Sequence, residues 1–167
     1  PETMNHLRKI LVTKDYVRYR LTGEYVTDFY DAIGTQLFDI SKNRWSDNHL
    51  KIINLSESLF PEVKFSSACA GLLLPEAAAD LGLFPGIPVA VGSGDSAVEA
   101  ASIGALRQGD AITKLGTAAN FNIINNSPLH NGQTINYPHV FNKNWIVISP
   151  LNSGTSTIEW FKESFCK

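Results

Sequence analysis

The sequence is poor in cysteine, the residue that holds small secreted proteins and many metal centres together. It contains 2 cysteines, Cys69 and Cys166, with no Cys-x-x-Cys pair and no histidine nearby at metal-ligand spacing. A disulfide framework or a zinc site needs more cysteines at closer and more regular spacing. We therefore expect two free thiols and predict no metal-binding residues within the chain.

Long apolar runs and an excess of one charge are also missing. No apolar run approaches the roughly 18 residues of a membrane-spanning helix, and no signal peptide is visible. The net charge is −2, from 14 Lys and Arg against 16 Asp and Glu, whereas a nucleic-acid or anionic-membrane surface needs a basic patch. We expect a cytoplasmic protein that binds neither nucleic acid nor membrane. The 167 residues are 44% hydrophobic, enough for one ordinary domain.

The most informative segment is residues 89–117. An apolar run, Val89 to Val91, predicts a buried strand, and the sequence Gly-Ser-Gly-Asp at 92–95 leads from it into a predicted helix. Small residues let a ligand approach the backbone, and the start of a helix offers free N–H groups to an anion. A carboxylate such as Asp95 can orient a hydroxyl there and accept its proton.

Two other interpretations apply to this segment. Asp95 ahead of an Ala- and Val-rich run is a favoured N-cap, with no chemistry implied. Residues 92–97 also match Gly-x-Gly-x-x-Ala, a dinucleotide-binding fingerprint, which wants an acid at the carboxyl end of the next strand. Asp110 precedes that strand and cannot reach a ribose from there, so the sequence does not favour a dinucleotide-binding site. Capping and catalysis by Asp95 are compatible.

Periodicity divides the chain into a helix-rich half and a strand-rich half. Apolar residues at Leu7, Ile10, Leu11, Val17 and Leu21 predict a helix over 3–21 that Gly23 ends. Further helices are predicted over 46–53 (Ser46 as cap, Leu50 and Ile53 inward) and 75–81 (ended by Gly82), and a short helical or turn segment, capped by Asp28, over 28–33. After Gly109, β-branched and aromatic residues predict strands over 111–115, 120–124, 134–141 and 145–149, then a helix over 155–165 with Ile158, Phe161 and Phe165 on one face. The four histidines are expected at the surface.

Short sequence blocks occur along nearly the whole chain. They begin with the segment TKDYVRYRLTGE at 13–24 and continue at 27–35, 38–39, 45–46, 59–63, 71, 75–78, 81–83, 92–95 and 115–117. In their order these blocks resemble the FGGY carbohydrate kinases, especially their xylulokinase-like branch, in which the segment at 13–24 is similar to a helix and turn. Any one block is weak, but several in the same order and spacing make the signal strong.

The resemblance implies an α/β fold of the ribonuclease-H-like (actin/sugar-kinase) type, with parts of two domains. Residues 1–106 would form the C-terminal part of the first, sugar-binding domain, and residues 107–167 the start of the second, nucleotide-binding domain. FGGY kinases are much longer, and their early phosphate loop and later adenosine segment have no counterpart here. We therefore expect an internal segment of a longer kinase, inactive by itself.

The same resemblance assigns roles to the substrate side of the site. Asp95 would be the general base for the sugar hydroxyl that attacks the γ-phosphate, and the helix dipole would stabilise its anion. Ser96 stands where an Asn often follows the Asp; its hydroxyl keeps a contact to the sugar but leaves the sugar's identity open. Asn120 replaces an apolar or aromatic residue and is predicted to contact substrate.

On the nucleotide side, Gly116 and Thr117 resemble the second phosphate loop, where turn N–H groups and the Thr hydroxyl donate to phosphate. A simple β-turn is the alternative. The turn at Gly154 and Thr155 leads into the last helix, which in the family borders the nucleotide phosphates, and Glu159 lies one turn inside it. A structural cap is the alternative for these three.

The function implied is ATP-dependent phosphorylation of a sugar hydroxyl, best a pentulose such as xylulose, with Mg²⁺ as cofactor. The partner is then a small-molecule sugar, and a homodimer of the full-length protein stays open. Two alternatives remain: a non-catalytic, kinase-derived module that binds a sugar or a partner, and an actin- or chaperone-like ATPase. The block at 13–24 speaks against the ATPase.

Overall fold

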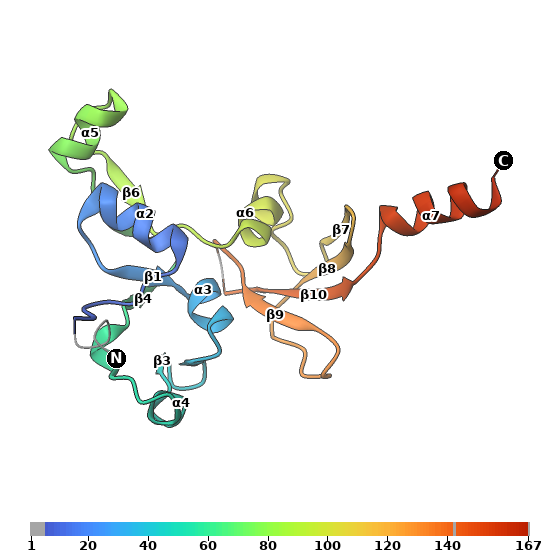
Figure 1. Cartoon of the computed structure of the whole chain (residues 1–167), viewed down its shortest axis with the longest axis horizontal. Helices are drawn as coiled ribbons and strands as arrows, with labels where there is room; N and C mark the ends of the chain where they lie inside the picture. Colours follow the sequence, from blue (N-terminus) through green and yellow to red (C-terminus); the bar gives the residue numbers. More distant parts are fainter. Residues whose placement is uncertain (1–5, 142, 167) are drawn as a thin grey trace. The chain divides into compact units, whose positions relative to one another are not determined.

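The chain folds into two compact units. The computed structural model describes residues 6–141 and 143–166, and the first unit ends at Gly94 where the second begins at Asp95 (Figure 1). Both units combine helices with strands. The expected mixed α/β composition is therefore confirmed.

The first unit consists of short helices and two-stranded sheets. Its elements are α2 (Thr13–Thr22), β1 (Val26–Asp28), α3 (Phe29–Gly34), β2 (Phe38–Asp39), β3 (Arg44–Trp45), α4 (Asp47–Ile52), a 3₁₀ turn (Glu57–Leu59), β4 (Glu62–Lys64), β5 (Cys69–Leu72), α5 (Pro75–Leu81) and β6 (Pro88–Ala90). Strand β1 pairs with β4 in parallel, whereas β2–β3 and β5–β6 are antiparallel.

Helix boundaries in this unit follow the local sequence signals. The side chains of Asp28 and Ser46 accept backbone N–H groups at the starts of α3 and α4. Pro75 opens α5, where its missing N–H leaves no hydrogen bond unmade. Gly23 and Gly82 end α2 and α5 with φ of 77° and 67°, a left-handed conformation that favours glycine. The predicted helices over 28–33 and 75–81 are confirmed.

An aromatic cluster forms the larger core of the first unit. Its buried members are Ala32, Phe38, Trp45, Leu50 and Phe60. The rings of Trp45 and Phe60 lie 4.6 Å apart, and Trp45 Nε1 donates to a backbone carbonyl at 3.0 Å. Burying each large apolar side chain is worth about 1.5–3 kcal/mol. Ile53, predicted to face inward beside Leu50, is 44% exposed because α4 ends at Ile52.

Helix α2 is shorter than predicted, and its buried side is polar. It begins at Thr13, residues 7–12 form no helix, and residues 3–5 lie outside the described part of the chain. Val17, expected on the apolar face, is 55% exposed, whereas Asp15 and Arg18 are buried. The apolar spacing therefore misidentified the face that packs inward.

Arg18 explains this inversion. Its guanidinium donates to the backbone carbonyls of Val26 and Val91 and to Asp15 Oδ1, the last at 2.9 Å. A planar donor with several N–H groups can satisfy carbonyls from two segments at once, which an apolar side chain cannot do. The helix is thus oriented by hydrogen bonds.

The strand predicted over 89–91 forms but is less buried than expected. Among the described residues, strand β6 pairs with β5 alone, and Pro88 and Ala90 are exposed while Val89 is half-buried. Val91, just after the strand, is the fully buried residue of this run. An apolar run alone does not distinguish a central strand from a strand in a two-stranded sheet.

The second unit is an antiparallel sheet with a helix before and after it in the chain. Its elements are α6 (Asp95–Ser102), β7 (Ala111–Leu115), β8 (Ala119–Asn125), β9 (Ile135–Pro138), β10 (Trp145–Leu151) and α7 (Thr155–Phe165). The strand order is β7-β8-β10-β9. The strands and the last helix predicted from the sequence are confirmed, although β9 covers only the middle of the predicted 134–141.

Helix α7 follows β10 (Figure 1), and its apolar residues are exposed. Ile158, Phe161 and Phe165, predicted to share one face, are all exposed, and no residue of the helix is buried. Both cysteines are free and exposed. Within residues 6–141 and 143–166, no helix combines the length and apolar character that crossing a membrane requires.

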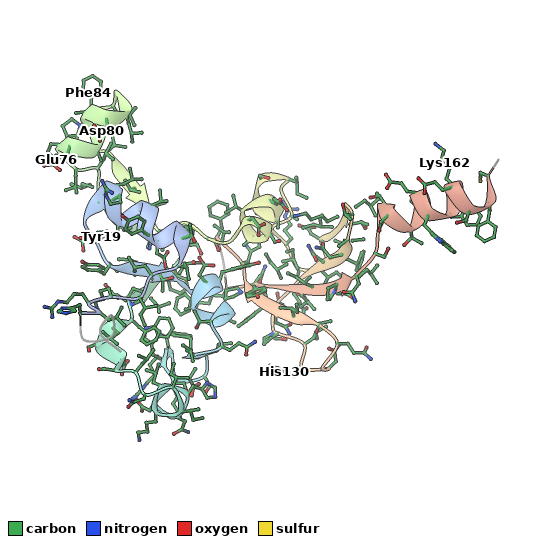
Figure 2. The ribbon with its side chains drawn as sticks, in the orientation of Figure 1. Tyr19, Glu76, Asp80, Phe84, His130 and Lys162 are labelled. Atoms are coloured by element: carbon green, nitrogen blue, oxygen red, sulfur yellow. The ribbon has the colours of Figure 1, made fainter. Side chains whose placement is uncertain are left out.

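One histidine contradicts the expectation of a surface position. His6, His49 and His130 are exposed, and Figure 2 shows His130 in the loop between β8 and β9. His139 is only 3% exposed; its Nε2 lies 3.1 Å from the carbonyl oxygen of Ala105, and its Nδ1 accepts the N–H of Phe141 at 3.3 Å. Burial lowers the pKa of His139, although the bond to Ala105 opposes that shift.

The depressed pKa of His139 predicts a pH-dependent stability. The folded chain resists protonating His139, whereas the unfolded chain binds a proton below about pH 6.5. Stability from this group is therefore present above about pH 6.5 and is lost as the pH falls through the folded pKa. Urea unfolding between about pH 5 and 7.5 should show a smaller loss on acidification in His139→Gln than in the parent.

The exposed His130 supplies the control for this measurement. His130→Gln should keep the parent's pH dependence, because His130 is exposed in the loop between β8 and β9 and its replacement leaves the buried His139 in place. Identical slopes for the parent and His139→Gln would show that burial of His139 has no energetic consequence.

Candidate functional site

All the site residues predicted from the sequence fall in the second unit. They come from the start of α6 (Asp95, Ser96), the β7–β8 turn (Gly116, Thr117), strand β8 (Asn120) and the beginning of α7 (Gly154, Thr155, Glu159). Their local surroundings can therefore be compared within one compact unit.

Asp95 is the first residue of α6 and is exposed. Its Oδ1 accepts the N–H of Ser96 at 2.7 Å, and Ser96 itself is half-buried. The partial positive charge of a helix N-terminus favours the carboxylate anion at this position. The side chain is thus accessible at the start of the helix.

A pocket of about 270 Å³ lies between α6 and the strands β7 and β8. Its lining residues are Ser96, Glu99, Ala100, Ser102, Ile103, Ile112, Thr113, Lys114 and Asn122. Ser96, a predicted sugar contact, is therefore joined by polar groups from the sheet. Pockets with a few convergent polar groups in an otherwise apolar lining are typical of small-molecule sites.

Lys114 and Glu99 place opposite charges at this pocket. Its Nζ lies 2.7 Å from Glu99 Oε2, and this hydrogen bond, together with the negative charges of Glu99 and Asp95, raises the pKa of Lys114. The structure pairs Lys114 with Glu99, in the electrostatic range of Asp95.

Two amides on β8 share the face that carries Lys114. Asn120 and Asn122 are two residues apart, so their side chains leave the strand on the same face, and they pair in register with Lys114 and Ile112. Within the described residues, the Oδ1 atoms of both are buried and have no hydrogen-bond partner. An unmet buried acceptor costs about 1–3 kcal/mol, which a donor from water or a ligand would recover.

Asn122 is a site residue that sequence reasoning missed. It is 3% exposed and lines the pocket. The alternation Asn-Phe-Asn at 120–122 is the signal that could have identified it, because a strand places the first and third residues together.

The structure brings together the two glycine turns predicted to bind nucleotide. Gly154 N–H donates to the carbonyl of Thr117 at 2.8 Å. Thr155 donates twice to the carbonyl of Gly116, from its N–H at 2.9 Å and from its hydroxyl at 2.8 Å. Ser156 adds a hydroxyl bond to the carbonyl of Thr117 at 2.9 Å. The β7–β8 turn and the start of α7 therefore form one connected element.

The donors of this element differ in part from the expectation. Gly116 N–H donates to the carbonyl of Ala118 at 3.0 Å, so this N–H closes the turn. Thr117 is exposed. Glu159 is exposed on α7, and among the described residues no hydrogen bond or ion pair joins its side chain to the other predicted residues.

Gly154 is required by the close approach of the two turns. A Cβ at this position would lie 2.6 Å from the carbonyl oxygen of Gly116 and 2.9 Å from Ala119 Cβ. We expect Gly154→Ala to push the turns apart and to lower the free energy of unfolding by about 1–3 kcal/mol, the usual cost of overpacking. Urea unfolding measures this loss.

Gly34→Ala is the matched control, because a Cβ on Gly34, at the end of α3, meets open space. It should leave the unfolding midpoint unchanged or raise it. Equal stability of the two alanine variants would contradict the tight approach at Gly154.

Comparison with known proteins identifies the family of the first two thirds of the chain. Residues 1–104 match the model of the FGGY family of carbohydrate kinases, N-terminal domain. The xylulose kinase of Escherichia coli K12 is 33% identical over 162 residues, which cover 96% of this chain and 33% of that protein. The xylulose kinase of Bacillus subtilis 168 is 36% identical over 118 residues, covering 71% of this chain and 24% of that protein.

Solved structures agree. A xylulose kinase from Brucella ovis superposes with a TM-score of 0.88 at 32% identity, covering 97% of this chain and 34% of that one. A second, from Rhodospirillum rubrum, has a TM-score of 0.91 at 22% identity over 98% of this chain and 33% of that one, a likeness of fold alone. This chain thus spans about a third of the length of these relatives.

These neighbours are sugar kinases with the actin/ribonuclease-H-like fold, which confirms the fold class predicted from the sequence. Because the family model covers residues 1–104 of 167, the chain belongs to the FGGY family of carbohydrate kinases.

Proposed function

We propose that this chain acts as part of an ATP-dependent carbohydrate kinase that phosphorylates a sugar hydroxyl, with a pentulose such as xylulose as substrate. The substrate proposal is supported by the xylulose kinases among its relatives. The observation that carries the chemistry is the accessible carboxylate of Asp95 at the start of α6. A non-catalytic module is not favoured, since the similarity to kinases covers 96% of the chain.

The chain would contribute to both domains of such a kinase. Residues 1–106 would belong to the first, sugar-binding domain, and residues 107–167 would begin the second, nucleotide-binding domain. The match of the N-terminal-domain model to residues 1–104 supports this division, as does the start of the β7-β8-β10-β9 sheet at Ala111. A cytoplasmic location follows from the proposal, because ATP is a cytoplasmic metabolite.

Asp95 would accept the proton of the attacking sugar hydroxyl. Phosphoryl transfer passes through a loose transition state, so the base chiefly orients the hydroxyl and takes its proton late. Ser96 and Asn120 would hold neighbouring hydroxyls of the sugar. The half-buried hydroxyl of Ser96 can donate and accept, and the buried Oδ1 of Asn120 needs a donor.

The connected turns would hold the phosphates of ATP. Gly116, Thr117, Gly154 and Thr155 lie in one hydrogen-bonded element, and the exposed Thr117 can donate its hydroxyl to phosphate. Glu159, one turn further along α7, would lie toward the nucleotide. Positioning of this kind supplies most of the rate in phosphoryl transfer.

Mg²⁺ fits this proposal as an ion held mainly by the nucleotide. Among residues 6–141 and 143–166, no group of three or more His, Cys, Asp or Glu side chains is arranged to bind a metal. In kinases Mg²⁺ needs only one or two carboxylates, because phosphates and water complete its shell. When bound, it would offset the negative charge that develops on the phosphates.

Asp95→Asn tests the assigned base in the full-length kinase that contains this segment. An amide keeps the size and a polar contact but cannot accept the proton, so turnover should fall by about 10²–10⁴-fold with the sugar KM changed less than about tenfold. Steady-state kinetics with xylulose and ATP measure both constants.

Glu76→Gln provides the control, since Glu76 is likewise an exposed acid in the first turn of a helix, α5 (Figure 2). Its turnover should match the parent. Near-parental turnover in Asp95→Asn would remove Asp95 as the base.

Asn120→Leu tests the sugar contact. Leucine removes the acceptor that we assign to a sugar hydroxyl, and a lost hydrogen bond of about 1.4 kcal/mol raises the sugar KM about tenfold while the ATP KM stays constant. Asn125→Leu, on the opposite face of β8, should change neither constant. A more stable Asn120→Leu protein with an unchanged sugar KM would make Asn120 a purely structural residue.

A further inference from the structure

The carboxylate of Asp28 is buried in the first unit and contacts several polar groups there. It ends β1, caps α3 and has no solvent exposure. Its Oδ2 accepts the N–H of Tyr30 at 3.1 Å and the hydroxyls of Ser66 and Ser93 at 3.2 and 2.8 Å. A helix cap needs only the first of these bonds. Capping therefore does not account for the hydrogen bonds from Ser66 and Ser93.

The positive charge of Lys14 offsets part of the cost of burying the Asp28 carboxylate. Lys14 Nζ lies 3.2 Å from Asp28 Oδ1, 3.2 Å from Asp31 Oδ2 and 2.7 Å from Asp15 Oδ1. Burial alone would lower the pKa of Lys14, but these carboxylates more than offset it and raise that pKa. The ammonium therefore stays charged beside Asp28, which a buried carboxylate requires.

The segment that Asp28 reaches through Ser93 leads directly to Asp95. Val91 N–H donates to the carbonyl of Ala68 at 2.9 Å, and Gly92 N–H to the carbonyl of Ser66 at 2.9 Å. Ser93 is 7% exposed and bonded to Asp28. Each residue from 91 to 93 is thus held by the first unit.

Gly94 is fixed by packing, since a Cβ there would lie 2.2 Å from the ring of Tyr30. Tyr30 in turn lies in the first turn of the helix that Asp28 caps, and its N–H donates to Asp28 Oδ2. Asp28 therefore accepts hydrogen bonds both from Ser93 and from Tyr30, the residue whose ring packs against Gly94.

We propose that Asp28 is a positioning residue for phosphoryl transfer: through Ser93 it fixes the backbone that carries the general base Asp95. This inference rests on the proposed function. Asp28 touches neither substrate nor nucleotide in this scheme. A base must stay within hydrogen-bond reach of its proton, and a displacement of about 1 Å can lower the rate about 10²-fold.

Two serines give a matched test in the full-length kinase. Ser93→Ala and Ser66→Ala each remove one buried hydroxyl that donates to the same Oδ2, but only Ser93 lies on the segment entering Asp95. Their losses of stability in urea should be similar. Ser93→Ala should lower the single-turnover rate of xylulose phosphorylation at least about tenfold with the ATP KM unchanged, whereas Ser66→Ala should stay within about twofold of the parent.

Asp28→Asn supplies a second variant, which loses both the charge facing Lys14 and part of the acceptor capacity. It should slow the same single-turnover step at least as much as Ser93→Ala; if it does not fold, the serine pair decides. Equal rates in the two alanine variants at equal stability would overturn the positioning role. A parent kinase without sugar-dependent ATP turnover would instead overturn the proposed function.

Discussion

The first unit depends on charges that are buried together. Removing an ion from water costs several kcal/mol, and only close opposite charges with well-made hydrogen bonds offset this. Asp15, Asp28 and Arg18 are all buried, with Lys14 partly so, and their bonds join α2 to β1 and to the residues after β6. The apolar clusters lie around this network and do not replace it. Lys14 contacts Asp15, Asp28 and Asp31, and Asp15 also contacts Arg18, so these elements hold their arrangement as a group.

In the second unit, backbone carbonyls instead join elements that are far apart in the sequence. Those of Gly116 and Thr117 accept bonds from the N–H groups and hydroxyls at the start of α7, across 39 residues of sequence. A hairpin turn and a helix start become one element because Gly154 lets the two backbones approach. If these turns hold phosphate as we propose, the connection would help them, because groups that are already fixed lose little freedom when a ligand binds.

The pocket beside α6 is lined by side chains of both charges and by the amide of Asn122. Lys114 is close to Glu99 and within the electrostatic range of Asp95, while Asn120 and Asn122 present buried acceptors on the same face of β8. A ligand rich in hydroxyl groups suits this lining, because it offers donors to the amides and acceptors to the ammonium. The lining is therefore compatible with the sugar substrate that we propose.

Local signals in the sequence were enough for most elements and for the position of the candidate base. Asp28 and Ser46 as caps, Pro75 and Gly82 as the limits of α5, and the strand beginning at Ala111 depend on residues only a few positions apart. The segment leading into Asp95 was recognised for the same reason. Family resemblance, carried by short blocks in order, added the fold class.

What the tertiary structure decided involves partners far apart in the chain. The polar side of α2 packs inward because Arg18 meets the carbonyl of Val91, 73 residues away, and His139 is buried because Ala105, 34 residues away, accepts its bond. No local periodicity contains such pairings. The sequence by itself determined where most helices and strands begin and pointed to Asp95 as the candidate base. Only the fold decided which polar groups are buried, because burial depends on distant partners that satisfy their hydrogen bonds and charges.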